Sequence, residues 1–418
     1  MDFFRFLMSD VLSEPAVLVG LIALIGLIAQ KKPVTECIKG TVKTIMGFVI
    51  LGAGAGLVVS SLGDFANIFQ HAFGIQGVVP NNEAIVSVAQ KSFGKEMAMI
   101  MFFAMVINIM IARFTPWKFI FLTGHHTLFM SMMVAVILAT AGMTGITLMA
   151  VGSLVVGVAM VFFPAIAHPY MKKVTGSDDV AIGHFSTLSY VLAGFIGSKF
   201  GNKEHSTEDM NVPKSLLFLR DTPVAISFTM SIIFLVTCLF AGADAVKELS
   251  GGKNWFMFSI MQSITFAAGV YIILQGVRMV IAEIVPAFKG ISDKLVPNAR
   301  PALDCPVVFP YAPNAVLVGF LSSFAAGLIG MFTLYLLNMI VIIPGVVPHF
   351  FVGAAAGVFG NATGGRRGAI LGAFAQGLLI TFLPVFLLPV LGDIGFANTT
   401  FSDADFGALG ILLGIIVR

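Results

Sequence analysis

Residues 119–141 read FIFLTGHHTLFMSMMVAVILATA, a run without Asp, Glu, Lys or Arg. A helix needs about 20 apolar residues to cross a bilayer, so this run predicts a membrane span. His125 and His126 lie inside it, where an imidazole needs a polar partner, a water-filled cavity or a ligand. A second Gly-His step, Gly183-His184, follows downstream. The two steps predict one polar site assembled from separate parts of a membrane protein.

The composition of the whole chain agrees with this class. Hydrophobic residues make up 58% of the 418 residues and charged residues 11%, whereas soluble domains carry about 25% charged residues. The 44 glycines and 40 phenylalanines suit closely packed helices in lipid. No basic cluster with interleaved aromatic residues indicates nucleic-acid binding. The fold class expected is an all-α polytopic membrane protein.

Apolar segments predict about eleven transmembrane helices, and several are shorter than a straight span or are interrupted by Gly or Pro. Residues 1–14 carry both signs of charge and lack a small-residue cleavage site, which favours an interfacial helix over a signal peptide. The predicted crossings are residues 16–30, 44–62, 97–112, 119–141, 144–168, 223–241, 256–284, 314–343, 346–363, 369–391 and 406–417.

The distribution of basic residues predicts the orientation, because Lys and Arg collect in cytoplasmic connections. With the N-terminus outside and the C-terminus inside, 18 of the 24 basic residues become cytoplasmic, Arg366 and Arg367 among them as topology anchors. The acidic turn with Asp393, Asp403 and Asp405 then lies outside.

Two long connections, residues 64–93 and 169–222, mix Gly, Pro and polar residues with apolar stretches. Irregular backbone at membrane depth survives only where protein or a water-filled cavity satisfies its polar groups, so both are predicted to be re-entrant segments that line a substrate path. Amphipathic helices on the membrane surface are the alternative.

Several polar positions inside apolar stretches have both a structural and a functional interpretation. Gln275, Arg278 and Glu283 favour a structural polar network over direct ligand contact, because a buried Arg needs partners. Asp304, flanked by Pro301 and Pro306, is equally a ligand-binding carboxylate at a helix break or a helix cap.

Small and sulfur-containing residues carry weaker signals. By itself, the run of Gly and Ala at 52–56 favours close helix packing over a backbone cradle for a ligand. Cys37, Cys238 and Cys305 have no paired spacing, which argues against a disulfide framework, a zinc site or redox chemistry.

The histidines leave three functions open: hydrogen bonding to a polyhydroxylated substrate, proton relay and metal binding. Metal binding is the weakest, because neither Cys nor a carboxylate has ligand spacing beside them, and we expect no metal and no cofactor. Adjacent residues of a helix point in different directions, so only one of His125 and His126 is expected to face a given site.

Several short runs recur along the chain in a characteristic order, namely residues 38–48 (IKGTVKTIMGF), 122–125 (LTGH), 182–184 (IGH), 275–279 (QGVRM), 287–292 (AFKGIS), 312–316 (APNAV) and 343–345 (IPG). In these runs the chain resembles the ascorbate-type enzyme IIC permeases of the bacterial phosphotransferase system, within the ascorbate/galactitol-type superfamily. The resemblance covers residues 20–370.

This resemblance implies one enzyme IIC transmembrane domain over residues 1–418, in which a V-shaped dimerisation scaffold and a substrate-carrying core interleave along the chain. It implies two inverted repeats, residues 15–210 and 211–418, a homodimer in the bacterial inner membrane, and elevator-like movement of the core. IIA and IIB components are the implied partners. IIB carries the phosphoryl group on a cysteine, so the permease itself is not the phosphorylating enzyme.

The resemblance also implies which residues bind the ligand. These are His125, His184 and Asp304, supported by the Gly54-Ala55 backbone and by Asn82-Glu83, while His126 is assigned a supporting, structural role. Hydrogen bonding of this kind suits a small polyol ring with an acidic enediol. Family members carry Gln four residues after the first histidine and directly after the second, whereas this chain has Phe129 and Phe185. That difference leaves the exact substrate open.

The leading hypothesis is uptake of L-ascorbate or a close sugar acid, coupled to phosphorylation. A permease for another polyol such as galactitol is the alternative in the same class. A proton-coupled secondary transporter, with the histidines and Glu283 as relay, is a second class. A membrane receptor or assembly factor is a third, which the many broken apolar segments disfavour.

Overall fold

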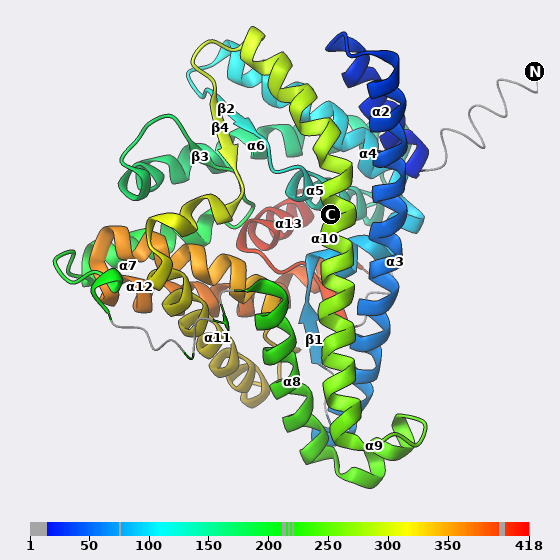
Figure 1. Ribbon diagram of the computed structural model, residues 1–418, viewed down its shortest axis with the longest axis vertical. Helices are drawn as coiled ribbons and strands as arrows, with labels where there is room; N and C mark the ends of the chain where they lie inside the picture. Colours follow the sequence, from blue (N-terminus) through cyan, green and yellow to red (C-terminus); the bar gives the residue numbers. More distant parts are fainter. Residues whose placement is uncertain are drawn as a thin grey trace, which may run out of the picture.

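The structure is a computed structural model that describes residues 15–74, 77–210, 215, 218–219, 221–392 and 398–417. The predicted interfacial helix of residues 1–14 and the predicted outer residue Asp393 lie outside the described residues. Helices dominate the architecture (Figure 1). The helices are α2 (Pro15–Ala29), α3 (Val34–Phe73), α4 (Asn82–Phe114), α5 (Gly124–Thr140), α6 (Gly145–Thr175), α7 (Thr187–Phe200), η2 (Thr207–Asp209), α8 (Thr222–Ala241), α9 (Ala243–Leu249), α10 (Trp255–Leu295), η4 (Cys305–Tyr311), α11 (Pro313–Leu336), α12 (Val346–Leu391) and α13 (Ala404–Val417).

Seven helices of the described chain are long and apolar enough to cross a membrane, namely α3, α4, α6, α8, α10, α11 and α12. This confirms a polytopic helical membrane protein. The eleven predicted crossings include helices that are short for a straight span, since α2 has 15 residues, α5 has 17 and α13 has 14.

One of the seven long helices, α12, folds back on itself. Gly364 and Gly365 leave helical geometry, and Gly365 has a φ of 60°, which favours glycine. Ser323 of α11 hydrogen-bonds His349 of the first arm and Gln376 of the second, both at 2.7 Å. The predicted crossings 346–363 and 369–391 are therefore the two arms of one helical hairpin.

Short strands join many of these helices, a feature absent from the sequence prediction. They are β1 (Gly77–Pro80), β2 (Phe119–Phe121), β3 (Ala181–Ile182), β4 (Arg300–Leu303), β5 (Val341–Ile342) and β6 (Thr399–Thr400). They form two three-stranded parallel sheets, in the orders β5-β1-β6 and β2-β4-β3. Each sheet takes its central strand from one half of the chain and its edges from the other. The ladders satisfy backbone groups that lipid would leave unpaired.

The first of the two predicted re-entrant segments consists of the end of one helix, a strand and the start of the next helix. Residues 64–73 continue α3 as one helix, residues 77–80 form β1, and residues from Asn82 onward begin α4. Gly74 ends α3 in the left-handed conformation, and the strand pairs with β5 and β6. In residues 169–222 the structure has the end of α6, then β3, then the 14-residue helix α7, which packs against α12.

Helices α2, α3, α8 and α10 pack mainly on one another and form a bundle along one side of the molecule, which we call the scaffold bundle (Figure 1). Gly54 of α3 meets Gly269 of α10 at a close crossing, where a Cβ on Gly54 would lie 2.9 Å from the Gly269 carbonyl oxygen. Phe65, Phe234 and Phe266 fill the interior of this bundle.

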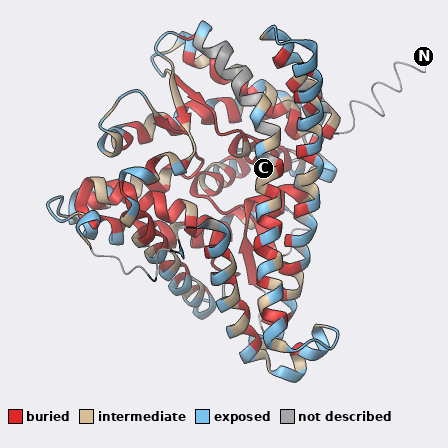
Figure 2. Cartoon of the chain, viewed as in Figure 1, coloured by how far each residue is buried: buried red, intermediate tan, exposed pale blue. Residues whose placement is uncertain are grey.

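Helices α4, α6, α12 and α13 pack around α5, together with α10 of the scaffold bundle, and the side chains of α5 are buried on all faces from His126 to Leu138. An apolar helix buried all round belongs to the interior of its fold. Figure 2 shows the buried residues gathered around this part of the molecule. The interior therefore holds the histidine-bearing N-terminus of α5 at a fixed position.

The element order of the first half recurs in the second. The first half runs in the order α2, α3, β1, α4, β2, α5, α6, β3 and α7. The second half repeats this order as α8, α10, β4, α11, β5, the first and second arms of α12, β6 and α13. Helix α9 and the 3₁₀ segment η4 are additions to the second half.

Candidate functional site

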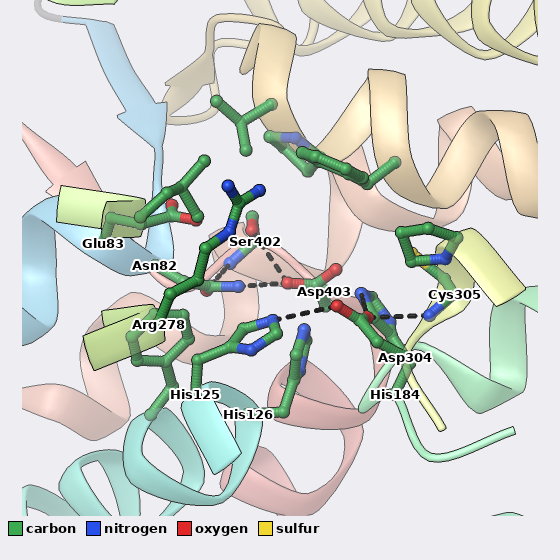
Figure 3. Close-up of a pocket in the computed structure, with 16 residues that line it drawn as sticks. Asn82, Glu83, His125, His126, His184, Arg278, Asp304, Cys305, Ser402 and Asp403 are labelled. Atoms are coloured by element: carbon green, nitrogen blue, oxygen red, sulfur yellow. Dashed lines mark hydrogen bonds and ion pairs between the residues drawn. The ribbon is translucent and has the colours of Figure 1, made fainter. Parts of the chain in front are cut away.

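A cavity of about 210 Å³ lies where the two sheets end (Figure 3). Each strand is followed within five residues by a residue that lines this cavity, and each of these residues lies at or near the start of a helix. In chain order after β1 to β6, they are Asn82, His125, His184, Asp304, Val347 and Ser402.

Three histidines and one carboxylate form one wall of the cavity. Asp304 Oδ2 lies 3.4 Å from His125 Nε2, and Asp304 Oδ1 lies 3.8 Å from His184 Nε2. The ring of His126 lies between the other two, 3.8 Å from the His184 ring centre and 4.8 Å from that of His125.

Buried partners fix the orientation of these rings. The Tyr190 hydroxyl lies 2.8 Å from His184 Nδ1, and the Phe185 backbone N–H donates to His126 Nδ1 at 3.3 Å. Because the Nδ1 atoms are engaged, both histidines are free to present Nε2 to the cavity. The Asp304 side chain is 37% exposed, which leaves its carboxylate accessible to a ligand.

Amide and acidic side chains form a second wall. The Asn82 Nδ2 donates to Asp403, and Asn82 Oδ1 accepts from the Ser402 backbone N–H at 2.9 Å. The Ser402 hydroxyl donates to Asp403 at 3.1 Å, and Glu83 lines the cavity beside them. Hydrogen bonds thus fasten the loop before α13 to the start of α4.

Helix caps place these loops. Asn81 caps α4 by accepting from Ala84 N–H at 2.7 Å, and Asp304 caps η4 by accepting from Cys305 N–H at 2.7 Å. Asp405, which is fully buried, accepts from the N–H groups of Thr187 and Leu188 at 2.8 and 2.9 Å, and so caps α7 from α13.

The cavity offers hydrogen-bond donors, acceptors and charges of both signs to a small polar ligand. The N-termini of α4, α5, η4, α12 and α13 meet here, and helix N-termini carry partial positive charge and free N–H groups. Hydroxyl groups of a ligand would find both donors and acceptors in the histidine rings, the Asn82 amide and the carboxylates. The volume of the cavity lies below the ~300–1,000 Å³ of sites for drug-sized ligands.

Comparison with known proteins decides the class. The family described as "PTS system sugar-specific permease component" matches residues 10–405, where PTS is the phosphotransferase system. The chain belongs to this family. The permease is 28% identical to the "Ascorbate-specific PTS system EIIC component" of Mycoplasma pneumoniae, over 96% of this chain and 67% of the relative. Permeases of this family are membrane transport components for sugars, and other components of the system carry out phosphoryl transfer.

The structure of the permease brings most of the predicted ligand residues together. His125, His184, Asp304, Asn82 and Glu83 all line the cavity, although they come from distant parts of the sequence. Gly54 and Ala55 belong instead to the middle of α3, where Gly54 packs on Gly269 of α10. They are not among the residues that line the cavity, so the helix-packing interpretation of the Gly-Ala run is the one the structure shows.

The expectation that only one of His125 and His126 faces the site is wrong. Both line the same cavity. They occupy the first turn of α5, and the cavity lies beyond the end of that helix, so the rotation between successive residues does not separate them.

The predicted polar network of Gln275, Arg278, Glu283 and His126 does not form. Arg278 lines the cavity, whereas the Glu283 carboxylate faces Gly40 of α3, and a Cβ on Gly40 would lie 3.0 Å from Glu283 Oε2. His126 packs with His184 instead. Five residues along a helix separate Arg278 and Glu283 too far in angle to pair.

The two phenylalanines that stand at family glutamine positions differ in role. Phe129 lines the cavity beside His125, with ring centres 5.8 Å apart. Phe185 is fully buried and stacks on Phe121, with ring centres 4.6 Å apart. Only Phe129 can therefore touch a ligand, and Phe185 is part of the hydrophobic core.

Sequence reasoning missed Ser402, Asp403 and Cys305 as cavity residues. Asp403 and Asp405 were placed in an outer turn, but the structure buries both, with 5% and 0% exposure. The available signal was Asp403-Ala404-Asp405 directly before a short apolar run, because acidic residues favour helix N-termini.

Donor atoms that can hold a metal ion also gather here, which the sequence spacing concealed. His125, His126 and Asp304 form one group, and His184, Asp304 and Cys305 form another, with the ligand atoms of each group within 4.8 Å of one another. The same atoms can also form hydrogen bonds to hydroxyl groups of a ligand.

Proposed function

We propose that this permease imports L-ascorbate, or a closely related sugar acid, and delivers it for phosphorylation by soluble IIA and IIB components. The observation that carries the proposal is the small cavity at which helix N-termini meet His125, His184 and Asp304. This arrangement offers hydroxyl-binding groups together with partial positive charge. The ascorbate-specific relative supports the same substrate class.

Transport occurs, in this proposal, by elevator-like movement of a substrate-carrying core against the scaffold bundle. The scaffold bundle supplies only Leu274 and Arg278 among the cavity residues, and the other lining residues belong to the rest of the molecule. A ligand bound there would be held mainly by one body. The recurring element order of residues 15–210 and 211–418 supports two inverted repeats, a common basis of alternating access.

The N-terminus is proposed to lie outside and the C-terminus inside, in a bacterial inner membrane. Three basic residues that are predicted to be cytoplasmic lie together beside the first residues of β2 and β4. The Arg300 N–H donates to the Lys118 carbonyl, and Lys172 and Arg300 both form ion pairs with Asp178. Helix α9 with Lys247, predicted to be outside, lies at the opposite end (Figure 1). This separation supports the orientation.

A homodimer that forms through the scaffold bundle completes the proposal. Between α8 and α10 lies an apolar groove lined by Val224, Phe228, Ile264 and Tyr271, each more than 40% exposed. Such a face suits either lipid or a second scaffold bundle. Cross-linking in native membranes distinguishes the two.

Uptake experiments in cells without another ascorbate permease test the function. We expect labelled ascorbate to accumulate in cells as a phosphorylated product only when IIA and IIB are co-expressed. In inside-out vesicles supplied with phosphorylated IIB, we expect a protonophore to leave the rate of ascorbate phosphorylation unchanged. Equal uptake without IIA and IIB that follows an imposed proton gradient would show a secondary transporter. Selective uptake of galactitol would show the alternative polyol substrate.

A further inference from the structure

Arg278 is the one Arg or Lys side chain among the described residues that line the cavity. It extends into the cavity from α10 of the scaffold bundle (Figure 3). The side chain is exposed. Leu274 is the other lining residue from α10, one turn earlier, so Arg278 is the only polar group that the scaffold bundle contributes to the cavity wall.

No carboxylate in the described part of the chain forms an ion pair with Arg278. The ion pairs there involve Glu36, Asp178 and Asp304, and Glu283 faces α3. Because the Arg278 side chain is exposed, its N–H groups are available to a ligand that enters the cavity. The site therefore has a place for an anion that the described chain does not fill.

Two of the three acidic residues that line the cavity are engaged elsewhere, and the third, Glu83, forms no ion pair with Arg278 in the described part of the chain. Asp304 has His125, His184 and the Cys305 N–H as partners, and Asp403 has Asn82 and Ser402. All of these partners belong to the loops and helix starts that form the cavity walls. None of them belongs to the scaffold bundle. Arg278 is left to pair with a group that enters from outside.

We infer that Arg278 binds the anionic oxygen of the sugar acid, so that this scaffold residue selects anionic over neutral sugars. A guanidinium donates two parallel N–H bonds to adjacent oxygens, which suits an enediolate or a carboxylate. The hydroxyl-binding groups lie on the two walls described above, so these walls and Arg278 would contact different parts of one ligand. This inference rests on the proposed function, because it needs a sugar acid in the cavity.

Equilibrium binding to the purified permease tests the inference with a matched pair of ligands. L-ascorbate is an anion at neutral pH, and L-gulono-1,4-lactone has the same ring size with no acidic enediol. Arg278→Gln is expected to weaken ascorbate binding about 10- to 100-fold, since a charge-assisted hydrogen bond is lost, and to leave lactone binding within about 2-fold. Arg278→Lys should restore part of the ascorbate affinity.

Lys294→Gln is the control, because it removes a positive charge from the same helix at an exposed position away from the cavity. It should change neither affinity. Elution as a single species in gel filtration establishes that each variant is folded. Equal losses for both ligands in Arg278→Gln, or no loss for ascorbate in either Arg278 variant, overturn the inference. Failure of the unmodified permease to bind ascorbate overturns the proposed function instead.

Discussion

Asp304 contacts both a histidine from α5 and one from the loop before α7, so a single carboxylate joins parts of the cavity wall that are 59 residues apart in the chain. Asp304→Asn keeps the size of the side chain but removes its charge and one of its acceptor oxygens. We expect ascorbate affinity to fall about 10- to 100-fold, with the fold retained, as measured by binding of labelled ascorbate.

His125→Ala should have a similar effect, because its ring approaches the same carboxylate. Asp244→Asn, an exposed change on α9, serves as the control for loss of an acidic group. If both Asp304→Asn and His125→Ala bound ascorbate as tightly as the unmodified protein, neither residue would belong to the ligand site.

Asp178 acts at a different place, in the loop between α6 and β3. Hydrogen bonds from His168, Arg300 and Lys172 hold the pKa of this carboxyl well below its ordinary value of 3.8. A carboxylate with a lowered pKa in the folded state stabilises the fold at pH values above the ordinary one, and the stabilisation is lost as the pH falls below it.

Asp178→Asn should therefore lower the Tm slightly from pH 7 to about pH 5, and the difference from the unmodified protein should shrink below about pH 4. The effect is small because the Asp178 side chain is 47% exposed and its ion pairs are screened by solvent. Asp179→Asn is the matched control, since Asp179 bonds only to Ser177 nearby. A Tm difference independent of pH would contradict this account.

At the scale of elements, α7 and α13 meet at their N-termini. Asp405 of α13 accepts from two N–H groups of α7, and the Ser186 hydroxyl before α7 accepts from the Ala404 N–H of α13 at 3.2 Å. Both N-termini are buried, with Thr187 and Ala404 at 0% exposure, so each helix depends on the other to satisfy its free N–H groups.

Asp405→Ala should destabilise the protein by about 2–4 kcal/mol, because two buried N–H groups lose their acceptors. It should also weaken ascorbate binding, because His184 lies three residues before Thr187. The measurement is unfolding by denaturant in detergent. Asp209→Ala removes a capping carboxylate in the exposed turn η2 and should cost less than about 1 kcal/mol. Equal effects of the two changes would show that burial of Asp405 is unimportant.

Over the whole molecule, composition and apolar run length were enough to predict a helical membrane protein. The family resemblance was enough to predict that His125, His184, Asp304, Asn82 and Glu83 belong together. Strands of two to four residues have no usable periodic signal, so the two sheets could not be read from the sequence. For the same reason, the strand within residues 64–93 was not predicted.

Charge and spacing misled at positions where tertiary packing decides. Asp403 and Asp405 were predicted only as part of an acidic turn on the outer side, and their burial through hydrogen bonds to Asn82, Thr187 and Leu188 was not foreseen. Arg278 and Glu283 read as one network, although they face opposite sides of α10. For Gly54, the Gly-Ala pattern alone predicted helix packing, whereas the family resemblance implied ligand contact. The structure shows packing on Gly269.

The exchange of strands between the two halves also sets the order of events during biosynthesis. The central strand β1 is made early, but one neighbour, β6, follows only near the end of the chain, and the Thr399 hydroxyl bonds to Val79 across 320 residues. The nascent chain must therefore hold β1 and the start of α4 without their final partners while most of the protein is inserted. The cavity acquires its second wall only when residues 398–405 leave the ribosome, so a message truncated before them yields a membrane-inserted chain that has no complete sugar site.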